Sequence, residues 1–566
     1  MKSRQIASRW FWGLALLAVT QIHVFAQSTP AAVAPVSNPC PRFAAGSIVH
    51  NPPALYSQNG RLTVNFSYQT TTDSAGRTLF CFMTSNGLEN PTLHVKPGDT
   101  LTVNVTNNVP ASSGMAMVMS SSSNTCASAT QTSTSLNIHY HGTNTSPTCG
   151  SDEVIHTLIN SGQSFQYNLQ FPTNEPPGLY WYHPHVHGIS EAALQGGASG
   201  AIVVDGLQAF QPAVAGLRHR ILMIRDQNTP GNLPPGGNVP SWDITVNNIP
   251  ITSPTTATGT TFVPAVLHML SGEKQLWRVS NSGADTILDL QLLFDGVPQN
   301  LQVVGLDGVP TGSQDGTRQG KIVNTKDILL PTAGRAEFIV SAPPSTVKLA
   351  QLVTLNINTG PIGDNDPARP VATIQTLGSD NDHQTTADND ENIPSTIPST
   401  WPQRFEGVMG ATPTVNRTLY FSEVLSDPNN PLSPTNFFIT VDGATPTLFD
   451  PTNPPAIITH QGTVEQWVVQ NRAQENHEFH FHQIHFQLLS QNNFETNGSV
   501  QNAAESGQFL DMVQVPFWDG VATDPYPSVT LKFDFTGPDV GDFVYHCHIL
   551  GHEDNGMMAI IRVLPN

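Results

Sequence analysis

The sequence predicts an all-β protein built from several sandwich or barrel units. Three observations support this fold class: 46 proline and 44 glycine residues in a chain of 566, short alternating runs such as 62–68 and 101–106, and turns such as 96–99. Alternation with a period of two is typical of strands that bury one face. Helical periodicity is scarce. At about 150 residues per domain, the length predicts three or four units.

Composition predicts where these units begin and end. Residues 379–412 are acidic and rich in proline, serine and threonine, which is typical of a solvated interdomain linker, with a functional acidic loop as the alternative. The stretch 211–378 has a strand-like pattern with two isolated histidines and no metal-binding cluster, so we expect it to be a spacer domain. The predicted domains are 27–210, 211–378 and 413–566.

A loose repeat links the three domains. A glycine turn precedes a strand in each of them, at Gly98, Gly272 and Gly462. We expect each strand to end near an asparagine. This repetition favours one β-fold present three times. The three asparagines are Asn104, Asn281 and Asn471.

Residues 1–26 have the features of a signal peptide. Basic residues in 1–9 precede the apolar run 10–18, and small residues lie ahead of Gln27. The apolar run is too short to span a bilayer comfortably, and no other segment predicts a membrane span. We therefore expect a secreted or periplasmic protein, present as a monomer.

The net charge of −20 argues against nucleic acid as a partner, because phosphate binding needs clustered lysine and arginine. This charge suits cationic or neutral small substrates instead.

The five cysteines divide into one metal-ligand candidate and an even set of four. Cys547 lies among histidines, and the remaining four are expected to form two disulfides in an oxidising compartment. Three pairings are possible. Because Cys126 and Cys149 bracket a histidine pair, we favour that bridge together with Cys40–Cys81; free structural thiols are the alternative.

Metal-binding side chains are concentrated in four histidine clusters, two in the first domain and two in the third. In a strand, both imidazoles of a His-x-His pair lie on one face. Cys547 has the opposite parity to its neighbours His546 and His548, and His477 has the opposite parity to His480 and His482. Cys547, His477, His552 and Met557 therefore predict a blue-copper site. Eight histidines remain for a second centre of about three coppers: His139, His141, His183, His185, His480, His482, His546 and His548.

These clusters resemble the three-domain multicopper oxidases, the family of laccases, bilirubin oxidases and cuprous oxidases. The resemblance covers nearly all of the mature chain and depends on HYHG, WYHPH, HEFHFH and HCHILGHEDNGMM. It implies three consecutive cupredoxin-like Greek-key barrel or sandwich domains. It also implies four coppers per chain. The type 1 ligands would be His477, Cys547, His552 and Met557, the type 2 ligands His139 and His480, and the type 3 ligands His141, His183, His185, His482, His546 and His548.

The resemblance implies a laccase-like enzyme that oxidises phenols or similar small reductants one electron at a time and reduces O2 to water. Electrons would pass through Cys547 into the neighbouring histidines. Water formation needs protons. Glu553 matches a family proton-donor position, and Asp152 resembles the acidic residue near the type 2 copper, although a turn-forming role fits Asp152 equally well.

Several features leave alternatives open. Glu478 stands where the family commonly has proline, and we expect a solvated surface side chain there. His187 and His485 extend the clusters, but we expect them to be second-shell or surface residues. A run of methionines at 115–119 is expected to be a core strand. The acidic balance, Glu478 and this run favour a second hypothesis, a cuprous or ferrous ion oxidase for metal tolerance; a non-catalytic copper-binding envelope or coat protein is a third.

Overall fold

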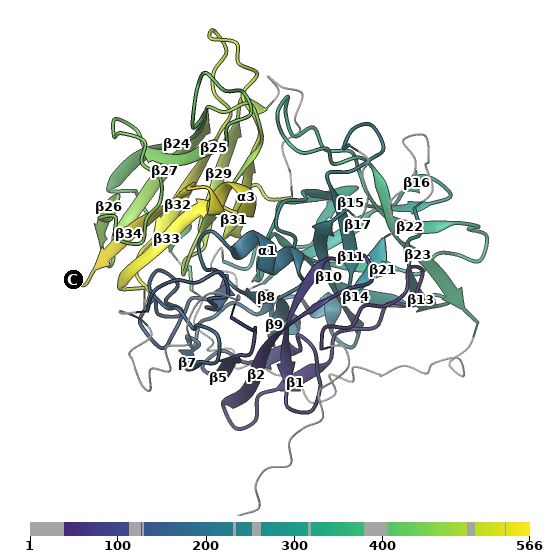
Figure 1. Cartoon of the computed structure of the whole chain (residues 1–566). Helices are drawn as coiled ribbons and strands as arrows, with labels where there is room; N and C mark the ends of the chain where they lie inside the picture. Colours follow the sequence, from purple (N-terminus) through teal and green to yellow (C-terminus); the bar gives the residue numbers. More distant parts are fainter. Residues whose placement is uncertain are drawn as a thin grey trace, which may run out of the picture. The chain divides into compact units, whose positions relative to one another are not determined.

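The computed structural model describes residues 39–111, 126, 129–229, 234–251, 262–314, 319–378, 404–405, 407–494, 504–537 and 539–566. They form the compact unit Pro39–Asn566, and most of its regular structure is strand (Figure 1). The predicted signal peptide and the methionine run lie outside the described residues. Within the described ranges, no helix is long and apolar enough to cross a membrane.

The first unit consists of two sheets. One has the strand order β3 (Thr78–Thr84), β2 (Arg61–Thr72), β5 (Thr100–Asn107) and β7 (Ser164–Gln170). The other has the order β1 (Ala54–Tyr56), β4 (Thr92–Val95), β9 (Gly200–Val204), β8 (Gly178–His183) and β6 (His139–His141). Side chains of β5 alternate between half-buried and buried, because one face of its sheet packs on the core.

The middle unit also has two sheets. The larger contains β12 (Ile249–Ile251), β11 (Trp242–Val246), β10 (Arg218–Asn228), β14 (Lys274–Asn281), β21 (Arg335–Ser341), β17 (Leu301–Leu306) and β18 (Val309–Pro310), with β19 (Val323–Thr325) beside β17. The smaller contains β13 (Ala265–Leu270), β23 (Arg369–Leu377), β22 (Ala350–Thr354), β15 (Leu288–Phe294) and β16 (Val297–Pro298), with β20 (Asp327–Leu330) beside β15.

The third unit repeats the arrangement. Its first sheet contains β25 (Thr435–Val441), β24 (Val415–Leu425), β27 (Val464–Asn471), β32 (Ser528–Asp534), β29 (Phe486–Asn492) and β30 (Phe509–Leu510). Its second contains β26 (Ile457–His460), β34 (Met558–Leu564), β33 (Gly541–Cys547), β28 (His477–Phe481) and β31 (Met512–Val515).

One pairing pattern recurs in all three units. The parallel pairs β2 with β5, β10 with β14 and β24 with β27 each have an antiparallel strand on either side. The second sheets share a parallel pair as well: β4 with β9, β13 with β23 and β26 with β34. The fold class predicted from the sequence, three similar all-β units in succession, is therefore confirmed.

The three units share an asparagine at the last residue of the strand that follows the glycine turn. Asn107, Asn281 and Asn471 end β5, β14 and β27, and the amide of each donates to two backbone carbonyls while its oxygen accepts a backbone N–H. The prediction of Asn104 for the first unit was wrong, because Asn104 bonds to the side chain of Asn65 on the exposed face.

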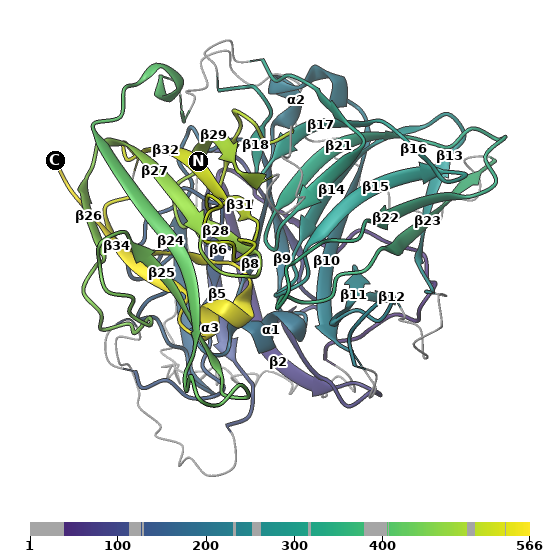
Figure 2. The same ribbon diagram turned by 90° about the horizontal axis from the view of Figure 1, so that it is seen from above.

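The three units share a buried apolar contact. Leu179, Ile221 and Met512 come from the first, middle and third unit and belong to one cluster of buried side chains. Helix α1 (Ser190–Gln195) of the first unit contacts helix α3 (Leu550–Asp554) of the third (Figure 2). The carboxylate of Asp554 accepts the backbone N–H groups of Gly188, Ser190 and Glu191 and so caps α1.

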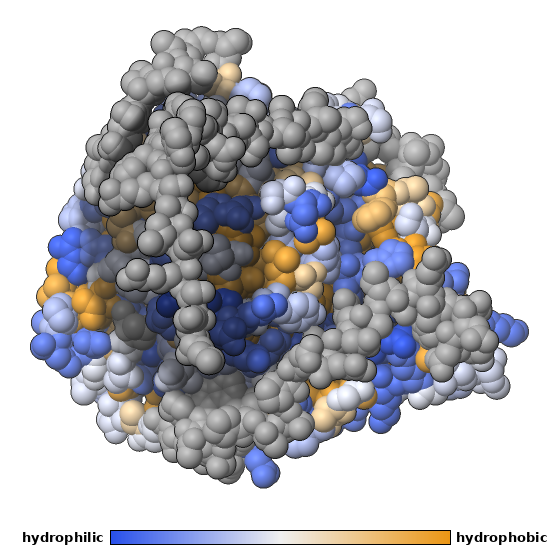
Figure 3. Space-filling model, turned by 90° about the horizontal axis from the view of Figure 1, so that it is seen from below, coloured by the Kyte–Doolittle hydropathy of each residue, from blue (hydrophilic) through white to orange (hydrophobic). Residues whose placement is uncertain are grey.

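Three further short helical segments lie within the described residues: α2 (Leu207–Phe210) and the 3-10 helices at Pro212–Val214 and Val408–Gly410. Seen from the side shown in Figure 3, hydrophilic and hydrophobic residues form small mixed patches on the coloured surface.

The structure contains the favoured disulfides, Cys40–Cys81 and Cys126–Cys149, and leaves Cys547 as a buried free thiol. Both bridges lie in the first unit.

Two segments differ from the predicted domain organisation. Val49 pairs with Val266 of β13 through its backbone, so this part of the N-terminal chain lies on the middle unit. The end of the predicted linker is packed: Arg404 pairs with Asp539 at 2.7 Å, and the buried ring of Phe405 stacks on Phe509. The expectation of a solvated linker was therefore wrong for these two residues, because their side chains pack against residues of the third unit.

Candidate metal centres

Strand β33 carries predicted ligands on both of its faces. In its antiparallel ladder with β28, His480 lies opposite His546 and Phe479 lies opposite Cys547. Since alternate side chains point to opposite faces, His480 and His546 share one face and Cys547 lies on the other. His477, at the start of β28, has the parity of Phe479. One strand pair therefore serves two centres.

The first centre brings together Cys547, His477 and His552. The Cys547 Sγ lies 3.7 Å from Nδ1 of each histidine, and the two Nδ1 atoms are 3.0 Å apart. Met557 is fully buried, and its backbone carbonyl accepts the N–H of Cys547. A thiolate with two convergent imidazoles and a nearby methionine is the donor set of a blue-copper site.

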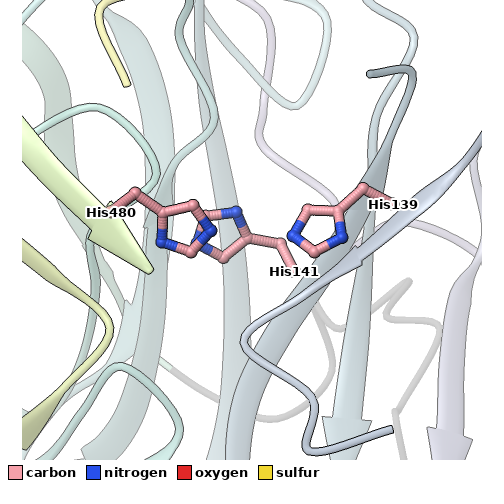
Figure 4. Close-up of side chains that lie close together, drawn as sticks. All are labelled: His139, His141 and His480. Carbon is pink, nitrogen blue, oxygen red and sulfur yellow. The ribbon is translucent and has the colours of Figure 1, made fainter. Parts of the chain in front are cut away.

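The second centre contains all eight remaining histidines, in three groups. The ligand atoms within each group lie within 4.8 Å of one another. Figure 4 shows the first group, in which His139 and His141 come from the first unit and His480 from the third. Each group combines both units, so the centre exists only where they meet. The other two groups are His141, His183 and His548, and His185, His482 and His546.

The ring nitrogens that have hydrogen-bond partners identify the nitrogens left for a metal. His139 directs Nδ1 to Asp152, and His480 directs Nδ1 to the carbonyl of Asp511; the Nε2 atoms of both are buried without a partner. His141 is reversed, because its Nε2 faces Asp511 at 3.3 Å and its Nδ1 is the unpartnered atom. Unpartnered buried polar atoms are costly, and copper at these positions would satisfy them.

Burial favours the neutral form of seven cluster histidines. It lowers their pKa well below the usual value of 6.5, with the neighbouring histidines acting in the same direction in most cases; these residues are His141, His183, His185, His480, His482, His546 and His548. Burial also raises the pKa of Cys547, so a thiolate there requires a cation. Neutral imidazoles and a cation-dependent thiolate fit copper.

Asp152 and Glu553, the two predicted carboxylates, both lie against the second centre. Asp152 Oδ1 is 3.1 Å from Nδ1 of His139, and its Oδ2 accepts a hydrogen bond from Gln483 at 2.6 Å. Glu553 places its oxygens 3.2 Å from Nδ1 of His546 and 3.7 Å from Nδ1 of His185. Burial raises the pKa of Glu553 well above 4.5, which favours the protonated form of the side chain.

Glu478 was expected on the surface, and that expectation was wrong. The side chain is fully buried, and its oxygens accept the N–H of Thr332 at 3.0 and 2.9 Å. The Thr332 hydroxyl lies within hydrogen-bonding distance of Glu478 and, at 2.5 Å, of the carbonyl of His548. Burial raises the pKa of Glu478 to about 8. The middle unit therefore replaces solvent around this carboxyl group.

Two models of the multicopper oxidase family match the chain, at residues 116–208 and 424–566. These ranges contain all the convergent histidines and Cys547. The chain belongs to the multicopper oxidase family. Membership implies copper binding, which the donor sets fit.

Relatives of this multicopper oxidase include plant and bacterial proteins. Multicopper oxidase LPR1 of Arabidopsis thaliana is 22% identical over 448 residues, covering 70% of this chain and 69% of the relative. Multicopper oxidase LPR1 homolog 5 of Oryza sativa is 32% identical over 138 residues, which cover 18% of this chain and 21% of that protein. A laccase of Bacillus subtilis is 32% identical over 111 residues, covering 17% and 20%.

Solved structures share the fold of this multicopper oxidase. A variant of McoA from Aquifex aeolicus superposes with a TM-score of 0.64 at 19% identity, covering 92% of this chain and all of the other. A protein described as a metallo-oxidase from Campylobacter jejuni gives a TM-score of 0.64 at 19% identity, covering 93% and 96%. The three units are thus cupredoxin-like domains.

Several residues around the candidate metal centres of this multicopper oxidase were not predicted from sequence motifs. Asp511 contacts two cluster histidines, and Arg335 of the middle unit pairs with it. Neither residue lies in a histidine motif, and one buried Asp–Arg pair across units leaves no local pattern. His485 is buried outside the histidine groups, with Nε2 directed at the carbonyl of Asp307 and 3.5 Å from Asp511.

A carboxylate pair lies beside the first centre. Glu423, Glu475 and His477 present ligand atoms within 4.8 Å of one another, and Glu475 Oε1 is 3.4 Å from Nε2 of His552. Burial, with the neighbouring Glu475, raises the pKa of Glu423 to about 8, and burial raises that of Glu475 to about 7. The two side chains come from β24 and the segment before β28, so only folding brings them together.

Proposed function

We propose that this chain is an exported copper oxidase that couples one-electron oxidation of a small reductant to the four-electron reduction of O2 to water. One observation supports this most strongly. The Cys547 group and the three histidine groups meet at the paired strands β28 and β33 and the residues that directly follow them, so an electron-accepting site and an oxygen-reducing site would lie back to back.

In the proposed enzyme, four coppers bind per chain. His477, Cys547 and His552 with Met557 would hold the type 1 copper, His139 and His480 the type 2 copper, and the two remaining groups of three histidines the type 3 pair. Copper supplies reversible one-electron chemistry at the first centre and oxygen reduction at the second.

The protein's own residues prepare these centres. Asp152 orients His139 by accepting from its Nδ1, and β33 joins Cys547 to His546 and His548 through the backbone. Glu553 Oε2 lies 3.2 Å from Nδ1 of His546, so a proton on this carboxyl group would be beside the centre where oxygen reduction requires one. These contacts support the proton-donor role predicted for Glu553.

The proposed reductant is a phenol or a similar electron-rich small molecule, as in laccases. A non-catalytic copper-binding envelope or coat protein fits less well, because a protein that only binds copper does not need eight convergent histidines.

A second candidate is oxidation of cuprous or ferrous ions. Glu478 cannot bind them, since it is fully buried. Glu423 and Glu475 favour this candidate instead: they lie beside His477 and His552, and carboxylates attract cations to the edge of the first centre. The fold is shared with a protein described as a metallo-oxidase.

Steady-state kinetics on a phenol, cuprous ion and ferrous ion decide between these candidates. Glu475→Gln and Glu423→Gln remove the ionisable carboxyl groups at this edge while preserving shape. A loss of about tenfold or more in kcat/KM, roughly 1.4 kcal/mol, confined to a metal ion would favour the metal-ion oxidase. Equal small effects on all three substrates would favour the phenol oxidase.

Asp442→Asn is the matched control. Asp442 is 52% exposed and pairs with Arg472 on the same unit, so this change removes a carboxyl group of the third unit without touching the proposed copper centre. Copper-loaded wild type that oxidises none of the three reductants would contradict the proposed function.

Export and a monomeric state complete the proposal. The two disulfides are consistent with an oxidising compartment, outside the cell or in a periplasm. Size-exclusion chromatography with light scattering tests the monomer.

A further inference from the structure

The middle unit contributes one side chain to the surroundings of the histidine cluster. Arg335, the first residue of β21, is fully buried. Its Nη1 and Nη2 lie 2.6 and 2.5 Å from the two carboxylate oxygens of Asp511 in the third unit. Its Nε donates to the carbonyl of Leu179 in the first unit at 3.3 Å. The guanidinium group therefore contacts all three units.

Asp511, in turn, contacts one histidine from each side of the cluster. Its Oδ1 is 3.3 Å from Nε2 of His141, and its backbone carbonyl accepts from Nδ1 of His480 at 2.8 Å. These contacts determine which nitrogen of each ring remains for a metal: Nδ1 of His141 and Nε2 of His480, both buried and unpartnered. Outer contacts of this kind orient metal ligands.

The Arg335–Asp511 pair is closely packed against the backbone of the first unit. Gly142, directly after His141, has φ +85°, and a Cβ there would lie 2.5 Å from both Arg335 Nη2 and Asp511 Oδ2. The N–H of Asp511 also donates to Asp307, which accepts the N–H of Arg335 at 2.9 Å. A glycine is required so that the first unit can approach the ion pair.

Energetics make Arg335 necessary for Asp511. A buried carboxylate is strongly unfavourable without a partner, and removing one member of a buried pair is strongly destabilising because it leaves the other charge uncompensated. The two-pronged contact also determines the orientation of the carboxylate plane, which a lysine would not do.

We propose that Arg335 is a positioning residue for the copper cluster: by holding Asp511, it directs Nδ1 of His141 and Nε2 of His480 toward the metal. The inference rests on the copper assignment of the proposed function. It gives the middle domain, predicted to be a spacer, a part in building a centre whose ligands lie entirely in the other two domains.

The test is Arg335→Lys in the full, copper-loaded chain, with bound copper and spectra as readouts rather than turnover. We expect the blue absorption of the Cys547 site to remain. Copper at the cluster should bind about 10- to 100-fold more weakly in competition with a chelator, and the electron paramagnetic resonance signal of the type 2 copper should change. Asp511→Asn, which removes the partner instead, should give the same pattern.

Arg278→Lys is the matched control. Arg278 is a buried arginine of the same unit, 3.3 Å from Glu337, and among the contacts of the described residues it reaches neither Asp511 nor a cluster histidine. The Arg278→Lys substitution should lower the midpoint of thermal unfolding without altering the affinity of the histidine cluster for copper.

Each outcome has a defined meaning. The inference would be overturned if Arg335→Lys left the copper affinity of the cluster and the type 2 signal unchanged. It would also be overturned if both test variants lost the blue site together with the cluster, because that result shows only a role in folding. Wild type that binds only one copper would overturn the proposed function itself.

Discussion

Each cluster histidine has two ring nitrogens, and the partner of one nitrogen decides the use of the other. His139 and His141 illustrate this. They are neighbours in one motif on β6, yet Asp152 engages Nδ1 of His139, whereas Asp511 engages Nε2 of His141. Their free nitrogens are therefore of opposite kinds, which no spacing rule predicts.

Cys547 is the residue on which the first centre depends. Cys547→Ser should abolish the intense blue absorption and oxidase activity, because the thiolate is both ligand and the start of the backbone connection to His546 and His548. Visible absorption and copper analysis check this, with loss of about one copper per chain expected. An intact blue band would contradict the assignment.

Glu553 should act in oxygen reduction and not in substrate oxidation. Glu553→Gln keeps the size of the side chain but removes its acidic proton beside His546, so reoxidation of the reduced enzyme by O2 should slow by about 100-fold. Stopped-flow traces of the two half-reactions measure this. Reduction of the blue centre serves as the internal control; equal slowing of both halves, or of neither, would refute the role.

At the scale of elements, the asparagine at the end of one strand in each unit joins neighbouring loops to the sheet. Asn107 donates to the carbonyls of Thr134 and Ile159 and accepts from Val109. The same three-bond arrangement at Asn281 and Asn471 explains why the repeat is visible in the sequence.

Removing one of these amides should destabilise the chain. Asn107→Ala leaves buried backbone groups without partners and should cost about 1–3 kcal/mol, seen as a lower midpoint of thermal unfolding. Asn104→Ala, in the same strand but on its exposed face, should change stability by less than about 0.5 kcal/mol. Similar midpoints for the two variants would disprove the structural role of Asn107.

At the scale of the whole molecule, the proposed copper cluster involves all three domains: two supply the convergent histidines, and the middle one supplies Arg335 and Thr332 beside them. The buried apolar cluster that includes Leu179, Ile221 and Met512 packs the three domains against one another. Because these contacts are apolar, salt should affect their association little.

Salt should act on the substrate instead. With a net charge of −20 and Glu475 beside His552, kcat/KM for a cationic reductant should fall severalfold as ionic strength rises and the Debye length shrinks from about 30 Å at 0.01 M to about 8 Å at 0.15 M. A neutral phenol of similar reducing strength is the control. Equal salt dependence of the two would exclude electrostatic attraction at the entry site.

The sequence by itself determined the all-β class, the threefold repetition of one β-unit and the side chains that converge, because strand alternation is local and assigns each ligand to a face. It favoured the disulfide pairing that the structure contains, with two other pairings left open. Tertiary structure alone decided how the histidines group in threes, which nitrogens stay free, that Glu478 is buried, and that Asp511 and Arg335 support the cluster. These features depend on contacts such as Arg335 with Asp511, between residues far apart in the chain, where burial and hydrogen-bond partners are set by packing between domains.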